Sequence, residues 1–254
     1  MDMGKLMVEV NNVSKSFGDN VVLNDISFNV EEGENFVVFG RSGTGKSVLL
    51  KCMVGLLEPD SGEIKINGKS VLNIPLDQMN EIRKHIGFLF QGSALYDSMS
   101  VRENLEFPLI RNFDFSPEER LEKVKTVLEN VGLEKAIDKK PSELSGGMKK
   151  RIGLARTIIT EPMLILYDEP TTGLDPITTK EISQLIVELQ KDLKSTSIVV
   201  THDLICAKIV ANRAIVLKDA RIKFEGDIKE LESSDDKFLK NFFSGEIVDA
   251  NSGE

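Results

Sequence analysis

The chain has 254 residues, enough for one large α/β domain or for one domain with an inserted subdomain. Its composition is that of an ordinary globular protein, with 41% hydrophobic and 29% charged residues, so a core of good size is expected. The formal net charge of −9 argues against a nucleic-acid-binding surface. It leaves open a local basic patch at Lys149, Lys150 and Arg151.

The cysteines and the apolar segments indicate the cellular compartment in which the protein is expected. Cys52 and Cys206 are far apart and match no metal or redox spacing, so we expect two small core residues of a reduced, cytosolic protein. The N-terminus lacks the apolar region of a signal peptide. No window approaches the roughly 18 apolar residues needed to span a bilayer. A role at a membrane is therefore expected to come through a partner.

The first part of the chain reads as strands separated by turns. Gly18-Asp19-Asn20 and Asn67-Gly68 are turn signals, and the second is a strong hairpin signal. The continuous apolar run at 36–39 is typical of a parallel sheet covered on both faces. Strands are predicted over five segments: 6–10, 23–30, 36–39, 63–66 and 86–90.

Residues from about 100 to 142 differ and predict a helical insert. Ser116-Pro117-Glu118-Glu119 is a capping box with proline at the first helical position, and apolar residues follow at helical spacing up to Gly132. From residue 163 the α/β alternation returns, and Asp175-Pro176 is expected to cap a helix that runs to about Leu193. Further strands are predicted over 163–167, 197–200 and 215–217.

One eight-residue segment, G-R-S-G-T-G-K-S, lies between a predicted strand and a predicted apolar helix. Its three glycines allow backbone N–H groups to turn inward around phosphates, and the helix adds its positive dipole end. Lysine reaches the β- and γ-phosphates, and the last serine places its hydroxyl on Mg²⁺. The alternative is a glycine-rich turn. We expect a nucleotide to bind along the whole segment: Gly40, Arg41, Ser42, Gly43, Thr44, Gly45, Lys46 and Ser47.

The other half of a hydrolytic site is predicted after the apolar run 164–167. Asp168 emerges where this strand ends, and ligands of open α/β sheets bind at that end. We assign Asp168 to Mg²⁺, through water, and Glu169 to the role of general base for the attacking water. The alternative is an acidic helix-capping pair before Pro170.

Three further residues are candidates by their position. His202 follows the strand predicted over 197–200, where it can contact a γ-phosphate and sense hydrolysis. Gln91 follows another strand and can reach Mg²⁺ or the attacking water from a loop. Phe17, ahead of Gly18, is a candidate for stacking on adenine, although an isolated aromatic residue is more often part of the core.

The order of these motifs resembles that of ATP-binding cassette (ABC) ATPases. Leu144-Ser145-Gly146-Gly147-Met148, about twenty residues before the Asp168 strand, is similar to the signature of that family. The resemblance covers nearly the whole chain and includes Phe17, Gln91 and Leu174-Asp175. It implies a P-loop NTPase of the ABC ATPase fold: a mixed α/β sheet core, an antiparallel β subdomain and an inserted helical subdomain.

The resemblance also implies a head-to-tail homodimer that encloses two ATP molecules with Mg²⁺. Ser145, Gly146 and Gly147 of one subunit bind the γ-phosphate held by Lys46 of the other, and Asp175 is carried over as a nucleotide-site residue. The residue pattern itself supports this arrangement, because a Ser-Gly-Gly sequence ahead of an apolar helix is a second anion site. One chain does not easily present both helix ends to one nucleotide, so a two-fold dimer is the economical solution.

A more specific resemblance comes from the segment after Gln91. Residues 92–98, Gly-Ser-Ala-Leu-Tyr-Asp-Ser, are similar to the ATPase of Mla-type transporters, which act on phospholipids with Mce-domain proteins. Main alternatives are an ABC ATPase for amino acids, metals or lipoprotein release, and a soluble ABC protein that clamps nucleic acid. A docking groove for permease helices is predicted at six apolar residues: Leu95, Tyr96, Met99, Leu105, Phe107 and Leu109. The alternative, equally compatible with the sequence, is that these residues form the ordinary core of the insert.

The sequence thus predicts a single ABC ATPase domain over 6–243, with a helical subdomain inserted at about 92–160 and a polar tail over 244–254. The expected cofactors are ATP and Mg²⁺. The expected partners are a second copy of the chain, an integral membrane permease and Mce-domain proteins, and no nucleic acid. The expected location is the cytoplasm, peripheral on the inner membrane.

Overall fold

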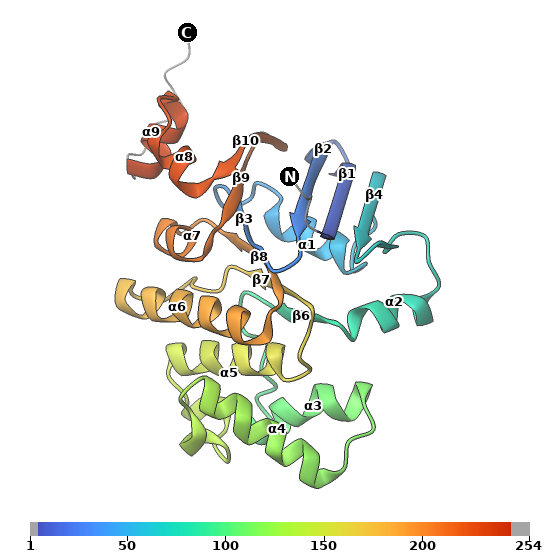
Figure 1. Cartoon of the computed structure of the whole chain (residues 1–254), viewed down its shortest axis with the longest axis vertical. Coiled ribbons are helices and arrows are strands. Elements are labelled where there is room, and N and C mark those ends of the chain that lie inside the picture. Colours follow the sequence, from blue (N-terminus) through green and yellow to red (C-terminus); the bar gives the residue numbers. More distant parts are fainter. Residues whose placement is uncertain (1–4, 245–254) are drawn as a thin grey trace.

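Two β-sheets organise the molecule in the computed structural model, which describes residues 5–244 (Figure 1). The smaller sheet is antiparallel in the order β2-β1-β4-β5. The larger has the order β10-β9-β3-β8-β7-β6, and β10 pairs antiparallel in an otherwise parallel sheet. The strands are β1 Leu6–Phe17, β2 Asn20–Glu31, β3 Asn35–Phe39, β4 Ser61–Ile66, β5 Lys69–Ser70, β6 Ile86–Leu89, β7 Leu164–Asp168, β8 Thr196–Thr201, β9 Arg213–Lys218 and β10 Arg221–Asp227.

Helices occupy both sides of the larger sheet and a separate region beyond it (Figure 1). Those described are α1 Lys46–Met53, α2 Leu76–Arg83, α3 Val101–Asn112, α4 Pro117–Asn130, α5 Gly146–Ile158, α6 Pro176–Leu193, α7 Leu204–Val210, α8 Ile228–Ser233 and α9 Lys237–Ser244. Helices α3, α4 and α5 lie between β6 and β7 in the chain and pack on one another. The predicted fold class, a mixed sheet with an antiparallel β subdomain and an inserted helical subdomain, is confirmed.

The larger sheet separates two apolar clusters, because successive side chains of its buried strands face opposite sides. In β7, Ile165 and Tyr167 join a cluster with α3–α8, whereas Leu164 and Leu166 join a cluster with α1, α2 and the antiparallel sheet. All five residues of β3 and of β7 are buried. The sheet therefore fixes the ends of its strands within a rigid core.

Local sequence signals explain where the insert's helices begin. The Ser116 hydroxyl accepts from the Glu119 amide and the Glu119 carboxylate accepts from the Ser116 amide, which confirms the predicted capping box. Ser100 and Glu103 form the same arrangement at α3, a helix the sequence reading did not delimit. On α3, Leu105 and Leu109 are fully buried, so these two proposed groove residues belong to the core.

Other boundaries differ modestly from expectation. Strands β1 and β2 extend further than predicted because they pair as one long hairpin around Gly18-Asp19. The strand expected over 86–90 ends at Leu89. Ser244 closes α9, and the rest of the predicted polar tail, 245–254, lies outside the described residues. Between residues 5 and 244, no helix is both long and apolar enough to cross a membrane.

The two thiols are predicted to be inert in the folded protein. Both are buried, and burial raises the pKa of Cys52 to about 11 and that of Cys206 to about 12. Because the thiolate is the reactive form, on the order of a thousandth or less of either is reactive at pH 8. Iodoacetamide labelling followed by mass spectrometry should modify neither residue in buffer and both in denaturant. Rapid labelling of the native protein would contradict this packing.

Candidate functional site

The predicted site residues converge because three adjacent parallel strands end at one edge of the sheet. Strand β8 pairs with β3 on one side and with β7 on the other. The segment 40–47 follows β3, Glu169 follows β7 and His202 follows β8. Segments far apart in sequence are therefore brought together at the carboxyl edge, where open α/β sheets bind ligands.

The loop after β3 has the shape of a phosphate cradle. Gly45 has φ 94° and a Cβ there would lie 2.6 Å from the Val22 carbonyl oxygen, so only glycine fits. At Gly40 a Cβ would lie 2.7 Å from the Leu217 carbonyl oxygen. Helix α1 begins immediately afterwards at Lys46, so its positive dipole end faces the loop. Arg41, Ser42 and Gly43 are exposed and accessible to a ligand.

Lys46 lies at the centre of this cradle and is only 5% exposed. Its Nζ donates to the carbonyl oxygens of Gly40 at 2.8 Å and Arg41 at 3.0 Å, and it lies 3.4 Å from Glu169 Oε1. Burial lowers the pKa of Lys46, and the Glu169 carboxylate opposes that shift. For Lys46 to bind a phosphate, its ammonium must exchange the carboxylate for the phosphate oxygens.

Ser47 and Asp168 form the candidate metal-binding pair. Ser47 Oγ donates to Asp168 Oδ1 at 2.7 Å, and burial raises the pKa of Asp168 despite this bond. A hydroxyl and a carboxylate are the hard oxygen ligands that Mg²⁺ prefers, and Mg²⁺ is usually held by one or two protein groups plus phosphates. No cluster of three His, Cys, Asp or Glu side chains that could hold a metal occurs among the described residues.

Glu169 is held by partners on several sides. Its Oε2 lies 2.8 Å from His202 Nδ1 and accepts from Thr172 Oγ1 at 3.2 Å, while Oε1 faces Lys46. The backbone of Glu169 is left-handed, with φ 52°, a strained conformation that recurs at active sites. The carboxylate is thereby fixed in the orientation in which it can accept a proton from a water.

The remaining predicted residues differ in how the structure places them. Gln91 is exposed just after β6, and Phe17 is 49% exposed at the end of β1 with Lys15 Nζ 5.6 Å from its ring centre. Asp175 is exposed and caps α6, accepting from the amides of Ile177 and Thr178. Its carboxylate therefore caps the helix, and its place in the nucleotide site stays a prediction.

The signature segment forms the start of α5. Ser145 is its N-cap and accepts from the Met148 amide at 3.3 Å. Gly146 is exposed and Gly147 is half-buried, so the first amides of α5 are available to an anion.

Sequence reasoning missed three contacts of this site. Thr172 bonds to Glu169, and Thr171 Oγ1 donates to Asp203 Oδ2 at 3.1 Å, which joins the β7 and β8 loops. Lys150 is buried with its Nζ at the main chain of the site. The two threonines were visible only as part of a loop, and Lys150 as part of an apparent basic patch.

Comparison with known proteins decides the family. The family model described as "ABC transporter" matches residues 23–172. The chain belongs to the ABC transporter family. It is the ATP-binding, ATP-hydrolysing component, since a similar solved structure, with TM-score 0.80, is the dimeric ATP-binding cassette MJ0796 in a post-hydrolysis state with ADP and Pi. That structure is 35% identical, and the match covers 87% of this chain and 99% of the cassette.

The names of similar proteins describe transport of different cargoes. The methionine import protein MetN of Clostridium tetani is 38% identical over 97% of this chain and 77% of its own length. The probable ribonucleotide transport protein mkl of Mycobacterium leprae is also 38% identical, over 98% and 71%. The intermembrane phospholipid transport protein MlaF of Haemophilus influenzae is 38% identical over 96% of this chain and 92% of its own length.

Removing the Ser47 hydroxyl should impair the use of Mg²⁺. Because Ser47→Ala deletes one oxygen ligand, the Mg²⁺ concentration for half-maximal ATPase activity should rise by roughly 10–100-fold. Ser47→Thr keeps the hydroxyl and is the matched control. The measurement is a Mg²⁺ titration of phosphate release at fixed ATP. An unchanged Mg²⁺ requirement in Ser47→Ala would show that the hydroxyl does not hold the metal.

Proposed function

We propose that this ABC transporter subunit closes as a homodimer around two Mg²⁺–ATP and powers phospholipid transport through a membrane permease. The observation that carries the proposal is the cluster of Lys46, Ser47, Asp168, Glu169 and His202 at one sheet edge. It combines a phosphate-binding cation, metal ligands and a positioned base, which are the parts that phosphoryl transfer to water needs.

In the proposed reaction, each side chain of the cluster has a separate role in ATP hydrolysis. Glu169 accepts the proton of the water that attacks the γ-phosphate, and His202, 2.8 Å away, orients the carboxylate and contacts the phosphate. Lys46 and the amides of 40–47 stabilise the negative charge on the phosphate oxygens. Ser47 and Asp168 would hold Mg²⁺, with Gln91 as the further residue proposed to reach it, and the ion would neutralise part of that charge.

Dimerisation follows from having two anion sites on one chain. The cradle around Lys46 is one, and the exposed start of α5 at Ser145–Gly147 is the other. A two-fold arrangement lets each nucleotide contact the cradle of one subunit and α5 of its partner. The MJ0796 cassette, similar over most of this chain, is described as a dimer.

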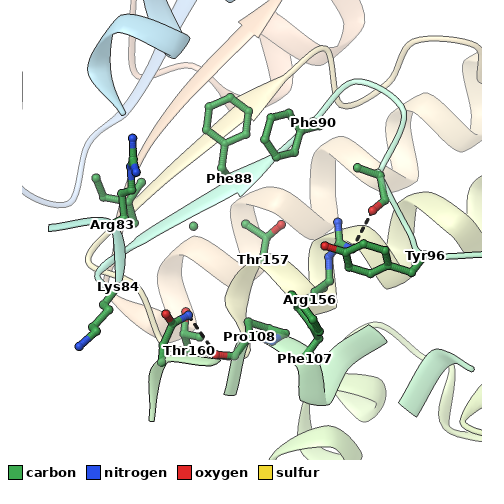
Figure 2. Close-up of a pocket in the computed structure, with 14 residues that line it drawn as sticks. Arg83, Lys84, Phe88, Phe90, Tyr96, Phe107, Pro108, Arg156, Thr157 and Thr160 are labelled. Atoms are coloured by element: carbon green, nitrogen blue, oxygen red, sulfur yellow. Dashed lines mark hydrogen bonds between the residues drawn. The ribbon is translucent and has the colours of Figure 1, made fainter. Parts of the chain in front are cut away.

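A groove beside the insert suits the permease. It has a volume of about 290 Å³ and lies between β6, α3 and α5; its aromatic lining includes Phe88, Phe90, Tyr96 and Phe107 (Figure 2). We call this the α3–β6 groove. Tyr96 is 45% exposed and its ring centre lies 5.1 Å from that of Phe107, so two of the six predicted docking residues present an apolar surface here. The lining also includes Arg83, Lys84 and Arg156, so we infer that an amphipathic segment of the permease contacts this surface.

The phospholipid cargo is the finer part of the proposal. It is supported by the segment 92–98 and by MlaF, which matches over 92% of its own length. MetN is equally identical, so methionine-type import is the alternative cargo. Either cargo places the subunit on the cytoplasmic side of the inner membrane, peripheral and held there by its permease.

Substituting the base should separate binding from hydrolysis. Glu169→Gln removes the proton acceptor but keeps the size of the side chain, so steady-state turnover should fall by roughly 10²–10⁴-fold while ATP still binds. The trapped ATP should also produce a dimer visible by light scattering. Glu188→Gln, on the exposed face of α6, is the matched control. Hydrolysis at the wild-type rate in Glu169→Gln would refute the assignment of the base.

Affinity purification from native membranes should test partner and cargo together. Recovery of a polytopic permease, an Mce-domain protein and phospholipid is expected, and Tyr96→Ala with Phe107→Ala should reduce it at least tenfold because the apolar contact is lost. Ile110→Ala, 56% exposed on the same helix α3 but outside the groove, is the control. A permease with a soluble binding protein and no lipid would overturn the cargo. Recovery of ribosomes or DNA alone would overturn transport.

A further inference from the structure

Lys150 is buried although it lies between two other basic residues. It is 6% exposed, whereas Lys149 and Arg151 are half-buried, so the predicted basic patch is interrupted at its centre. Burial lowers the pKa of Lys150, opposed by the carboxylates of Glu169 and Asp168. An ammonium in such a place needs hydrogen-bond acceptors, because an unpaired buried charge is strongly unfavourable.

The acceptors of Lys150 are main-chain atoms of the hydrolytic site. Its Nζ donates to the Gln91 carbonyl oxygen at 2.5 Å and to the Glu169 carbonyl oxygen at 3.4 Å. These two residues follow β6 and β7, which are neighbouring parallel strands. The Lys150 side chain of α5 therefore joins two loops. One carries Glu169, the candidate base, and the other carries Gln91, the candidate residue for contacting Mg²⁺.

The Glu169 peptide is fixed from both sides by these contacts. Its amide donates to the Val200 carbonyl oxygen at 2.9 Å, and its carbonyl accepts from the Thr172 amide at 3.3 Å and from Lys150 Nζ at 3.4 Å. Since the backbone at Glu169 is left-handed, the residue needs such support to keep its conformation. The direction of its carboxylate toward Lys46 and His202 depends on that backbone.

Helix α5 also holds the rest of the Gln91 loop. Six residues after Lys150, Arg156 donates to the carbonyl oxygens of Ser93 at 2.7 Å and Ala94 at 2.8 Å, both residues with positive φ. Between the two cations, a Cβ at Gly153 would lie 2.9 Å from the side chain of Leu89 at the end of β6 and 3.0 Å from that of Ser93, so the helix packs directly on the strand end and on the loop. In Figure 2 Arg156 lies beside Tyr96 at the α3–β6 groove.

We propose that Lys150 is a positioning residue for ATP hydrolysis, which fastens the main chain of Gln91 and Glu169 to helix α5 and so sets the direction of the Glu169 carboxylate. The inference rests on the proposed role of Glu169 as base. Because Ser145–Gly147 begin the same helix, a displacement of α5 on binding the partner's nucleotide would move Glu169 through its contact with Lys150. Docking of a partner at the α3–β6 groove would move the loop after Gln91 through its contacts with Arg156.

The test uses Lys150→Met, which keeps the length of the apolar stem but removes the donors. Turnover at saturating ATP should fall at least tenfold, because misplacing a reacting group by about 1 Å costs up to 10²-fold. The KM for ATP and the Kd for ATP in Glu169→Gln and in Glu169→Gln/Lys150→Met should stay unchanged. Lys150→Gln, which restores an N–H donor, should have a kcat between those of Lys150→Met and the wild type. Lys149→Met is the matched control and should behave as wild type.

An unchanged kcat in Lys150→Met, or an equal loss of kcat and ATP affinity, would overturn the proposal in favour of a packing role. If Lys150→Met does not fold, Lys150→Gln decides, since it too must lower kcat without altering ATP affinity. The residual turnover of Glu169→Gln/Lys150→Met should match that of Glu169→Gln, because both residues act on one step. A multiplicative further loss would overturn the link. Failure of the base assignment is seen separately, as wild-type turnover in Glu169→Gln alone.

Discussion

The charge of Glu169 is the feature on which the arrangement of the site depends. A carboxylate in this buried position must be compensated, and its partners come from separate segments: Lys46 at the start of α1, His202 after β8 and Thr172 in its own loop. The parallel pairing of β3, β8 and β7 brings these partners to the carboxylate. It also places the candidate phosphate-binding cation and the candidate base 3.4 Å apart, so under the proposed function a phosphate would compete with Glu169 for Lys46.

Helix α5 connects this constellation with the rest of the molecule. Its first turn carries the exposed anion site, its middle carries Lys150 against Gln91 and Glu169, and its last turns carry Arg156 at the α3–β6 groove. The same helix therefore contacts the candidate sites for the partner subunit's nucleotide, for hydrolysis and for the permease. At Gly153 the helix packs against Leu89 and Ser93 with no room for a Cβ, so α5 is in close contact with the end of β6 and with the loop that follows.

Features set by local signals were predictable from the sequence. The apolar runs gave β3 and β7, the capping box gave α4, and Asp175-Pro176 gave the start of α6. Features set by tertiary packing were not. Leu105 and Phe107 are both apolar in sequence and both lie on α3, yet Leu105 is core and Phe107 lines a groove, because that depends on which face of α3 meets α4 and α5. From the sequence, Lys150 is expected to be a surface charge. Its burial depends on the carbonyl groups of Gln91 and Glu169, which lie near it only because β6 and β7 are neighbours in the sheet.

We propose that Lys46 exchanges Glu169 for the phosphates of ATP, which leaves Glu169 free to act as a base. The decisive measurement is a structure of the unmodified chain with Mg²⁺ and a non-hydrolysable ATP analogue. We expect Lys46 Nζ on the β- and γ-phosphates, Ser47 and Asp168 around the metal, and Ser145–Gly147 of a second copy on the γ-phosphate. An analogue bound away from residues 40–47, with Lys46 still on Glu169, would contradict it.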